Sequence, residues 1–244
     1  MNIIKLNATN STNDYLKEIV RKQFLENFLV VVANNQLQGK GQRHSKWESE
    51  PGKNLTFSVL VRDIIYNPSE LFILNAAVAC SVFECVAVQT EKKCAIKWPN
   101  DIMADGRKIS GILIENLIQQ NNMPTSIVGI GLNLNQIEFK GLPHVTSLKL
   151  LEQKDFDLDL ILNQIVNKLK ENISMLEKGS VDFLWSKYEA NLFRKEIPTT
   201  FENHKKEKFM GIIKGVSKTG QLKVLVEDFS MKLFSMKEIK MLYY

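Results

Sequence analysis

A polar stretch between positions 36 and 53 contains the first candidate binding residues. Its centre reads Gly39-Lys40-Gly41-Gln42-Arg43-His44-Ser45-Lys46-Trp47. Glycines allow main-chain amides to approach an anion closely, the lysines and the arginine supply charge, and the tryptophan supplies a flat apolar surface. The segment differs from a Walker A loop, which requires G-x-x-x-x-G-K-[ST]. Two interpretations stay open: a phosphate-binding loop and a solvated basic loop.

The second candidate is the segment Lys97-Trp98-Pro99-Asn100-Asp101. It offers an amide and a carboxylate where the chain leaves an apolar segment, although an Asx turn capped by Asn100 would have the same sequence. Lys108 follows the Asp105-Gly106 turn and begins an apolar strand that contains Ser110-Gly111. A lysine on a rigid strand beside a glycine is suited to hold a carboxylate or a phosphate. The alternative is a lysine that merely extends its ammonium group to solvent.

Two other segments carry weaker signals. Gly129-Ile130-Gly131-Leu132-Asn133 ends a predicted strand, and its alternating glycines leave room for a ligand or for a closely packed neighbour. Ser11-Thr12-Asn13 precedes a helical pattern, where a helix cap is the simpler interpretation. The histidines His44, His144 and His204 lack metal-ligand spacing, so we expect no metal site built from protein side chains. No G-x-S-x-G motif supports a Ser-His-Asp triad.

Hydrophobic periodicity predicts the strands and helices on which these candidate residues lie. Strands are expected over 28–34, 55–61, 108–115 and 126–134, and helices after 10–13, from Pro68-Ser69-Glu70, over 158–169 and over 181–192. Consecutive strands with a hairpin turn at Asp105-Gly106 indicate a largely antiparallel or mixed sheet. After Pro198 the sequence changes to short β-rich stretches at 209–216, 221–227 and 240–243, which predict a small β-barrel-like appendage of SH3 size.

Length and composition exclude several classes of protein. The 244 residues are 44% hydrophobic and 24% charged, as in ordinary globular proteins of one or two domains. No apolar run reaches the length of a membrane span and the N-terminus lacks a secretion signal, so we expect a cytoplasmic protein without a membrane partner. Cys80, Cys85 and Cys94 have no C-x-x-C spacing and are expected to be reduced thiols. The net charge of +5 suits nucleotide phosphates but is too diffuse to indicate DNA binding.

The order and spacing of these motifs resemble the bacterial biotin protein ligase family, also called biotin-[acetyl-CoA-carboxylase] ligases. The resemblance extends over nearly the whole chain and is carried by Ser11-Thr12-Asn13, Gln36 before Gly39, the loop ending in Trp47, the segment 97–101, the segment 106–113 and the segment 129–133. It implies an α+β fold. A class II synthetase-like catalytic domain, with a mixed β-sheet flanked by helices, would occupy residues 1–195, and an SH3-like β-barrel would occupy residues 196–244. It also implies the short form of the family, without an N-terminal DNA-binding domain.

The same resemblance implies an ATP-dependent ligase. Biotin and ATP, with Mg²⁺, would give biotinyl-5'-AMP and pyrophosphate, and biotin would then pass to one lysine of a biotin carboxyl carrier protein. Lys108 would hold the biotin carboxylate and the α-phosphate, and Asp101 would orient the incoming amine or accept its proton. The implied biotin-binding residues are Ser11, Thr12, Asn13, Gln36, Gly39, Lys40, Gly41, Gln42, Lys108, Gly111 and Gly129, with the apolar chain of biotin along Gly111, Gly129 and Gly131. The implied adenylate-binding residues are Lys40, Gln42, Arg43, Trp47, Asn100 and Asn133. A homodimer is expected by the same resemblance.

One departure from the family pattern concerns the glycine loop. Family members carry an arginine directly after each glycine, whereas this chain has Lys40 and Gln42, with Arg43 one position later. Lysine lacks the bidentate fork of arginine and glutamine is neutral, so the hypothesis is that Arg43 or Lys46 compensates, or that the adenylate is held less tightly.

The alternative functions to a biotin protein ligase are a lipoate or octanoate ligase, a non-catalytic biotin-binding regulatory module and a nucleic-acid-binding module.

Overall fold

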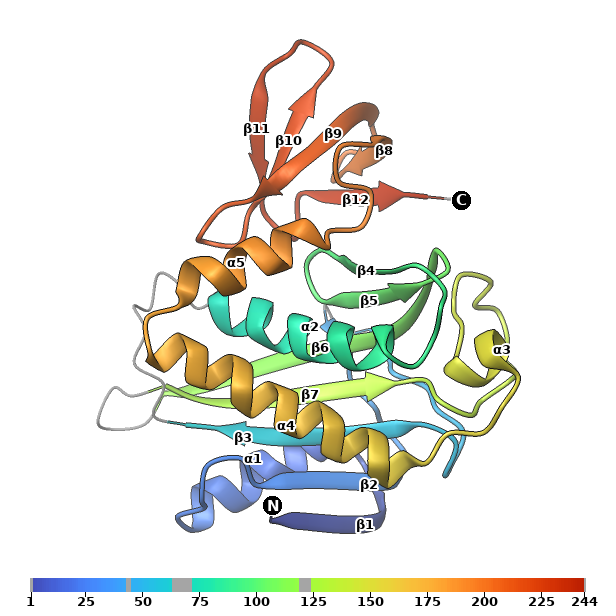
Figure 1. The fold of residues 1–244 in the computed structure, drawn as a ribbon, viewed down its shortest axis with the longest axis vertical. Coiled ribbons are helices and arrows are strands. Elements are labelled where there is room, and N and C mark those ends of the chain that lie inside the picture. Colours follow the sequence, from blue (N-terminus) through green and yellow to red (C-terminus); the bar gives the residue numbers. More distant parts are fainter. Residues whose placement is uncertain (1, 43–44, 63–71, 119–123, 244) are drawn as a thin grey trace.

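The larger of two β-sheets has seven strands and is mixed. The computed structural model of the protein describes residues 2–42, 45–62, 72–118 and 124–243 (Figure 1). The strands, in spatial order, are β1 (Ile3–Thr9), β2 (Val30–Gln36), β3 (Leu55–Val61), β7 (Pro124–Leu132), β6 (Arg107–Ile118), β5 (Asp101–Ala104) and β4 (Cys94–Lys97). β1 and β2 are parallel, and the other neighbours are antiparallel. The mixed sheet expected from the sequence is thereby confirmed.

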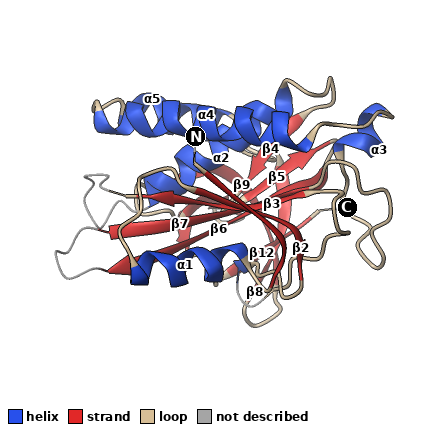
Figure 2. Ribbon diagram, turned by 90° about the horizontal axis from the view of Figure 1, so that it is seen from below, coloured by secondary structure: helices blue, strands red, loops and turns tan. Residues whose placement is uncertain are grey.

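Helices cover both faces of this sheet. Figure 2 shows α1 (Thr12–Lys22) on one side, and α2 (Phe72–Ala87), α4 (Leu158–Glu177) and α5 (Val181–Ala190) on the other. A short helix, α3 (Leu148–Glu152), follows β7. The side with three long helices holds the larger core, because α2 is buried along nearly its whole length against α4 and the sheet. The smaller core lies under α1 and includes Leu16, Val20, Val31, Leu60 and Ile127.

Side-chain size differs sharply between the two faces of the central strands. Because successive residues of a strand point to opposite faces, Phe57, Val128 and Ile130 point to the three-helix side and join its core. The intervening residues face α1 and are small: Thr56 and Ser58 on β3, Gly129 and Gly131 on β7, and Gly111 on β6, with Ser58 paired to Gly129 and Gly111 paired to Gly131. A hollow therefore forms beside the N-terminus of α1.

The second sheet is antiparallel and has five strands. Its order is β11 (Met231–Phe234), β10 (Leu222–Val226), β9 (Lys208–Val216), β8 (Pro198–Asn203) and β12 (Ile239–Leu242). This agrees with the SH3-like domain expected from the sequence. It packs against the larger body: the Trp98 indole Nε1 donates to the Gly220 carbonyl at 2.9 Å, and the Val216 amide donates to Glu189. The domain boundary between residues 195 and 196 remains a prediction; β8 begins at Pro198.

Several expected elements are confirmed, and others were not foreseen. The strands over 55–61, 108–115 and 126–134 and the helices over 158–169 and 181–192 are present. The N-terminal strand β1, the helix α3 and the strands β8 and β11 are additions to the sequence-based prediction. The proposed helix start at Pro68-Ser69-Glu70 lies outside the described residues, and α2 is described from Phe72. Among the described helices, none combines the length and apolar character needed to cross a membrane.

Candidate active site

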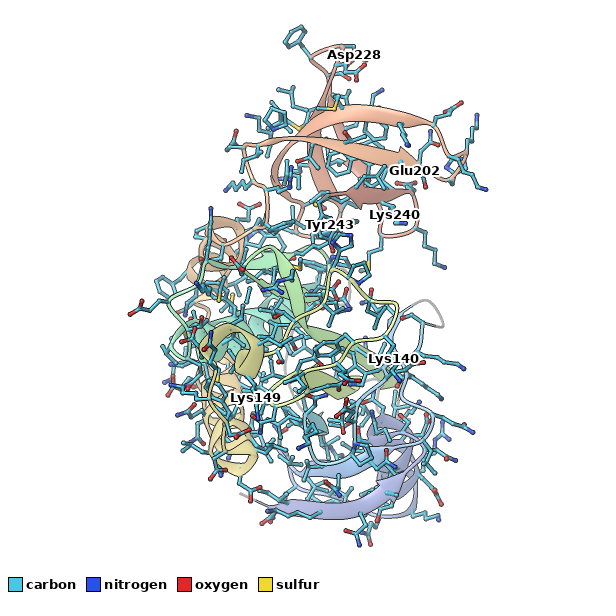
Figure 3. The ribbon with its side chains drawn as sticks, turned by 90° about the vertical axis from the view of Figure 1, so that its right-hand side faces the viewer. Lys140, Lys149, Glu202, Asp228, Lys240 and Tyr243 are labelled. Atoms are coloured by element: carbon cyan, nitrogen blue, oxygen red, sulfur yellow. The ribbon has the colours of Figure 1, made fainter. Side chains whose placement is uncertain are left out.

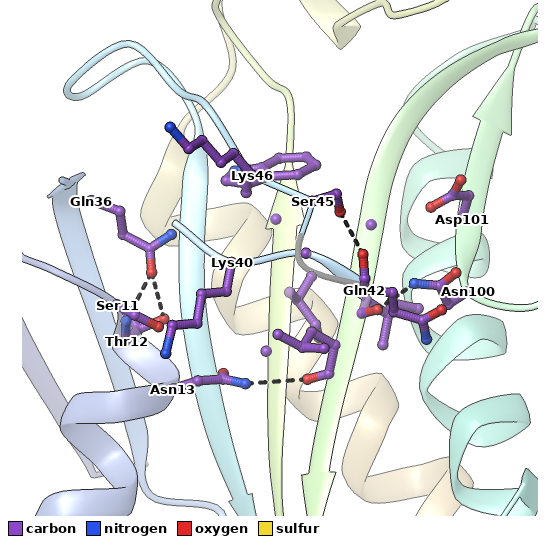
Figure 4. A pocket seen from close by; sticks show the side chains of 18 of the residues that line it. Ser11, Thr12, Asn13, Gln36, Lys40, Gln42, Ser45, Lys46, Asn100 and Asp101 are labelled. Atoms are coloured by element: carbon purple, nitrogen blue, oxygen red, sulfur yellow. Dashed lines mark hydrogen bonds between the residues drawn. The ribbon is translucent and has the colours of Figure 1, made fainter. Parts of the chain in front are cut away.

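A cavity of about 190 Å³ lies in the hollow on the α1 side of the sheet (Figure 4). Segments that are far apart in the sequence converge on it: the N-terminus of α1, the end of β2, the glycine loop, and strands β3, β5, β6 and β7. The lining residues are Ser11, Thr12, Asn13, Gln36, Lys40, Gly41, Gln42, Ser45, Lys46, Trp47, Phe57, Asn100, Asp101, Lys108, Gly111, Ile112, Leu113, Gly129, Ile130 and Gly131. Most of the residues singled out in the sequence therefore meet in one place.

The polar end of the cavity is built where α1 begins. Ser11 is the N-cap of α1, and its hydroxyl accepts from the Asp14 amide at 3.4 Å. The backbone amide and the hydroxyl of Thr12 both donate to Gln36 Oε1, at 2.8 and 3.1 Å. Because the Gln36 oxygen accepts both bonds, its amide nitrogen remains as a donor. The helix cap and the ligand-binding interpretations of this segment are therefore compatible, since the cap leaves Thr12 and Gln36 at the cavity wall.

A buried polar network supports this wall from behind. Ser58, which is fully buried on β3, donates to Asn13 Oδ1 at 2.6 Å and lies 2.7 Å from Thr12 Oγ1. Asn13 Nδ2 donates to Glu115 Oε2 at 2.8 Å, and Lys17 binds the other oxygen of Glu115 at 2.9 Å. A Cβ at Gly129 would come within 2.4 Å of Asn13 Oδ1. The space left by Gly129 is thus filled by the Asn13 side chain.

A lysine and an aspartate on adjacent strands form the charged end of the cavity. Lys108 Nζ lies 2.7 Å from Asp101 Oδ1, and Lys97 Nζ lies 3.7 Å from the other carboxylate oxygen. A bulge between β5 and β6 pairs Met103 with Lys108 and Asp101 with Gly111, so that Lys108 shares a face with a glycine three residues further on. A Cβ at Gly111 would lie 3.2 Å from Lys108 Nζ. Gly111 therefore makes room for the end of the lysine.

The segment 97–101 forms the turn between β4 and β5. Lys97 pairs with Asp101, and the intervening Trp98-Pro99 peptide bond is cis. Asn75 Nδ2 donates to the Pro99 carbonyl at 2.7 Å, and Asn100 Nδ2 donates to the Ile112 carbonyl at 2.5 Å (Figure 4). Asn100 is thereby held at the cavity wall with its side-chain amide already bonded to β6.

The described residues of the glycine loop line one side of the cavity, where 39–41 pair antiparallel with 45–47. The Gly41 amide donates to the Ser45 carbonyl at 2.7 Å, and the Trp47 amide donates to the Gly39 carbonyl at 2.9 Å. Lys40 Nζ is anchored to Asp14 at 2.6 Å, so the loop is tied to the first turn of α1. Burial would raise the pKa of Asp14, but hydrogen bonds from Lys17 and Lys40 outweigh it and hold that pKa below its usual value.

Trp47 lies flat against the sheet. A Cβ at Gly131 would come within 2.3 Å of the indole, and Lys108 Nζ lies 5.9 Å from the ring centroid. Its Nε1 is buried and has no hydrogen-bond partner among the described residues. The space left by Gly131 therefore accommodates the tryptophan, and the indole forms a wall of the cavity next to Lys108.

Two residues proposed from the sequence are not among the described residues that line the cavity, and a third lies outside the described residues. Asn133 is buried, and its Nδ2 donates to the Thr146 carbonyl at 3.0 Å. Gly39 lines a neighbouring groove on the other side of the loop, where a Cβ would meet the Trp47 carbonyl at 2.3 Å. Arg43 lies outside the described residues. Lys46, one of the two residues expected to compensate for Gln42, does line the cavity.

The sequence analysis missed the residues that support the cavity wall from behind. Ser58 and Glu115 hold Thr12 and Asn13, yet each lies in an apolar strand. Ser58 interrupts the apolar run of residues 55–61, and Glu115 ends the run of residues 109–114. A polar residue inside an apolar strand segment, or directly at its end, is a signal for a hydrogen-bond network, and it could have identified both.

Comparisons with known proteins agree with this geometry. The biotin/lipoate A/B protein ligase family model matches residues 6–133, just over half of the chain. The bifunctional ligase/repressor BirA of Bacillus subtilis is 34% identical over 137 residues, which are 55% of this chain and 41% of that protein. The chain thus spans about two fifths of the length of that relative. The BirA of Escherichia coli is 26% identical over 241 residues, 97% of this chain and 73% of that protein.

A solved structure extends the likeness to the whole chain. The biotin protein ligase from Aquifex aeolicus in complex with biotin and ATP superposes with a TM-score of 0.81 and 28% identity. The match covers 100% of this chain and 99% of that one. With the matched family model, the shared fold and the cavity that gathers the family-like motifs, the chain belongs to the biotin/lipoate A/B protein ligase family.

Proposed function

We propose that the protein is an ATP-dependent biotin protein ligase. The observation that carries this proposal is one cavity with two different ends: a hydrogen-bonding end at Thr12 and Gln36, suited to a neutral polar ring, and a cationic end at Lys108, suited to a carboxylate and a phosphate. Biotin has this polarity, with a ureido ring at one end and a carboxylate at the other. The relatives named ligases, and the Aquifex aeolicus structure that holds biotin and ATP, support the assignment.

The reaction would proceed in two steps. An oxygen of the biotin carboxylate attacks the α-phosphorus of ATP, the bond to the bridging oxygen breaks, and pyrophosphate leaves with that electron pair. The ε-amine of an acceptor lysine then attacks the carboxyl carbon of biotinyl-5'-AMP, AMP leaves, and the amine loses a proton. Because a carboxylate is a weak nucleophile facing an anionic polyphosphate, charge neutralisation and positioning should supply most of the acceleration.

Lys108 and Asp101 have distinct proposed roles. Lys108 neutralises the biotin carboxylate and the α-phosphate as they approach one another. Asp101, which lies 2.7 Å from Lys108, orients the incoming amine or accepts its proton once the lysine has turned to the substrates. Ser11, Thr12 and Gln36 would bind the ureido ring, with Asn13 holding Thr12 in place through Ser58.

The glycine loop would cover the adenylate. Trp47 offers an aromatic plate beside Lys108, while Lys40, Gln42 and Asn100 supply polar groups at the same wall. Roles for Gly39, Arg43 and Asn133 in adenylate or biotin binding stay proposals carried by the resemblance alone. The anchoring of Lys40 to Asp14 suggests that this lysine contributes by fixing the loop.

Mg²⁺ would enter with ATP. In the described part of the chain no group of three or more His, Cys, Asp or Glu side chains could hold a metal ion, and Asp101 is the carboxylate at the cavity. Mg²⁺ commonly keeps several waters and is bound by one or two carboxylates together with substrate phosphates. The residues fit an ion of that kind, which would lower the repulsion between the phosphates and the attacking carboxylate.

The acceptor, the assembly and the compartment are further parts of the proposal. The acceptor is the biotin carboxyl carrier protein of a carboxylase. A homodimer would form through the larger sheet, where β1 is an edge strand. The cytoplasm is the proposed compartment, since Cys80, Cys85 and Cys94 are free thiols, as a reducing environment maintains them. Light scattering at micromolar concentration would measure the oligomeric state.

The experiment that tests the proposed function is ATP–pyrophosphate exchange with the purified protein and Mg²⁺. Parallel reactions contain biotin, lipoate, octanoate or no acid, so the assay reports adenylation alone and needs no carrier. Exchange that depends on biotin supports the ligase. Exchange with lipoate or octanoate and not with biotin would indicate a lipoate or octanoate ligase instead. The absence of exchange with every acid would contradict an adenylating enzyme.

A further inference from the structure

Helix α2 is apolar along nearly its whole length, and three of its polar side chains contact different parts of the molecule. Ser81 accepts from Asn172 Nδ2 on α4 at 2.9 Å, and Glu84 forms an ion pair with a lysine of α5. Asn75 instead reaches the larger sheet, where its Nδ2 donates to the Pro99 carbonyl in the β4–β5 turn at 2.7 Å. Two of these contacts join helices, and the third holds a turn that lines the candidate active site.

The Pro99 carbonyl is also approached from a second helix. The hydroxyl of Tyr188 on α5 lies 3.4 Å from the same oxygen, and the Tyr188 side chain is fully buried. The Phe72 ring packs edge-on against the Tyr188 ring, with centroids 5.8 Å apart. A backbone carbonyl that is shielded from water needs donors, and here α2 supplies a short hydrogen bond and α5 a longer one.

The contacts to Pro99 also fix the two residues that follow it. The Pro99 carbonyl and the Asn100 amide belong to one planar peptide group, so a fixed carbonyl fixes the orientation of that plane. The Ile112 amide donates to the Asn100 carbonyl at 3.0 Å, and Asn100 Nδ2 donates to the Ile112 carbonyl. Asp101 comes next and lies 2.7 Å from Lys108. The second half of the turn is therefore held by α2 and α5 on one side and by β6 on the other.

The first half of the turn has a different support, the C-terminal sheet. Trp98 Nε1 donates to the Gly220 carbonyl at 2.9 Å, and Lys97 Nζ lies 4.8 Å from the Tyr243 ring centroid. Figure 3 shows Tyr243 at the edge of the C-terminal sheet that faces the larger body. Because the two halves have separate supports, removal of the donors to Pro99 should act mainly on the second half of the turn.

Asn75 and Tyr188 are not among the described residues that line the cavity. Both helices lie on the three-helix side of the larger sheet, whereas the cavity lies on the α1 side (Figure 2). Any effect of these two side chains on the reaction must therefore pass through the turn. A general base must come within about 2.6–3.2 Å of the group whose proton it accepts, so small displacements of Asp101 matter.

We propose that Asn75, supported by Tyr188, is a positioning residue for Asp101 in the transfer step. The proposal rests on the proposed function, since it deepens the role of Asp101. In that step the amine nitrogen bonds to the carboxyl carbon of biotinyl-5'-AMP, the bond from that carbon to the phosphate oxygen breaks, and AMP leaves with the electron pair. Asp101 orients the amine or accepts its proton, and the bond from α2 to Pro99 holds Asp101 where it can do so.

The test compares Asn75→Leu with a matched control, Ser81→Ala. Leucine has nearly the shape of asparagine and cannot donate, while Ser81 lies six residues further along the same helix and bonds α4. Tyr188→Phe removes the second donor and leaves the ring. The readouts are single-turnover transfer from synthetic biotinyl-5'-AMP to a carrier domain, biotin-dependent ATP–pyrophosphate exchange, the KM for biotin and the free energy of unfolding.

Asn75→Leu is expected to slow transfer roughly tenfold, the factor that one ordinary hydrogen bond provides, and to change exchange less than about threefold. The KM for biotin should stay within about twofold, because the bonds between Thr12 and Gln36 do not involve the turn. Tyr188→Phe should slow transfer about twofold, since its contact is long.

The double variant, Asn75→Leu with Tyr188→Phe, should lose more than the product of the two single losses, because the Pro99 carbonyl then keeps neither donor. Equal losses of transfer and exchange in Asn75→Leu would indicate a general loss of structure and overturn the proposal. The same conclusion would follow from an equal transfer loss in Ser81→Ala, or from full transfer activity in the double variant.

Amide NMR spectra of the ¹⁵N-labelled protein separate this proposal from the proposed function. The backbone amide signals of Asn100 and Asp101 should shift in Asn75→Leu and stay in place in Ser81→Ala. Such shifts support the hold of α2 on the turn even where no acid supports exchange, a result that would contradict the ligase alone. Biotin-dependent exchange combined with unshifted Asn100 and Asp101 signals would uphold the ligase and overturn the positioning role.

Discussion

Lys108 Nζ and Asp101 Oδ1 lie 2.7 Å apart across β5 and β6, in a cavity that also receives the N-terminus of α1 and the glycine loop. The bulge at Ile102 and Met103 makes this contact, because it turns Lys108 onto the face that Asp101 and Gly111 share. Asp101 therefore holds the lysine in place, and the same carboxylate also lies 3.7 Å from Lys97. A substrate carboxylate or phosphate would have to compete with Asp101 for it.

Lys108→Ala is expected to reduce biotin-dependent ATP–pyrophosphate exchange by roughly 10²–10³-fold, since it removes the cation at which negative charge develops. The measurement is kcat and KM for exchange with biotin. Lys149→Ala is the control, because Lys149 forms an exposed ion pair with Asp155, a kind of contact that contributes little. A kcat for Lys108→Ala within about threefold of the control would remove this residue from the catalytic step.

Asp101→Asn should separate the two half-reactions. The amide cannot accept the proton of the incoming amine, so transfer of biotin to the carrier should fall at least tenfold more than exchange does. Exchange and single-turnover transfer from synthetic biotinyl-5'-AMP are measured side by side. Equal losses in both assays would mean that Asp101 acts by holding Lys108, with no separate role in transfer.

Gly131→Ala should disturb Trp47, because the added Cβ would lie within 2.3 Å of the indole. Such crowding typically costs about 1–3 kcal/mol in the free energy of unfolding. The informative comparison is a double-mutant cycle with Trp47→Ala, measured by urea denaturation. Gly131→Ala should cost far less when the indole is already absent. Additive losses would show that the alanine acts elsewhere.

Much of the fold was predictable because its signals are local. The Asp105-Gly106 turn adopts positive φ at both residues, 52° and 72°, as a two-residue hairpin requires. On β3, which is buried on both faces, the alternating large apolar residues are those that pack in the larger core: Leu55, Phe57, Val59 and Val61. β1 was missed because it is an edge strand in which exposed Lys5, Asn7 and Ala8 break the apolar pattern. Because an edge strand buries few of its side chains, its sequence shows no clear alternation of apolar and polar residues.

The site was predictable as a set of motifs and not as a set of contacts. Alternating glycines at 129 and 131 indicated room beside the strand, yet the structure fills that room with Asn13 and Trp47. Which side chain enters a gap depends on pairings between segments about a hundred residues apart, such as Asn13 with Leu113 and Glu115. Sequence spacing carries no information on such pairings.

Ser58→Ala should weaken biotin binding indirectly, because Ser58 holds Thr12 and Asn13 and does not itself line the cavity. It removes the hydroxyl that bonds Asn13 and Thr12, and a buried acceptor left without its donor costs about 1–3 kcal/mol. We expect a lower free energy of unfolding and a KM for biotin raised several-fold, with the KM for ATP unchanged. Ser126→Ala is the control, since Ser126 is a buried serine on β7 that bonds Asn116 at the far end of the sheet. A control variant with the same rise in the KM for biotin would contradict a local effect.

Asp14 links α1 to the glycine loop, since it binds Lys17 at 2.7 Å and Lys40 at 2.6 Å. Burial alone would raise its pKa, but hydrogen bonds from both lysines hold it below its usual value. A carboxyl with a depressed folded-state pKa contributes stability above its unfolded pKa and loses that contribution as the pH falls through the folded value.

The difference in unfolding free energy between the unsubstituted chain and Asp14→Asn should therefore be constant from about pH 7 down to about pH 5, and should shrink below about pH 4. Urea denaturation of both proteins at each pH gives this difference, in which the other titrating groups cancel. A difference that persists unchanged at about pH 2.5 would show that the Asp14 charge contributes nothing, and that the loop is held by its backbone hairpin alone.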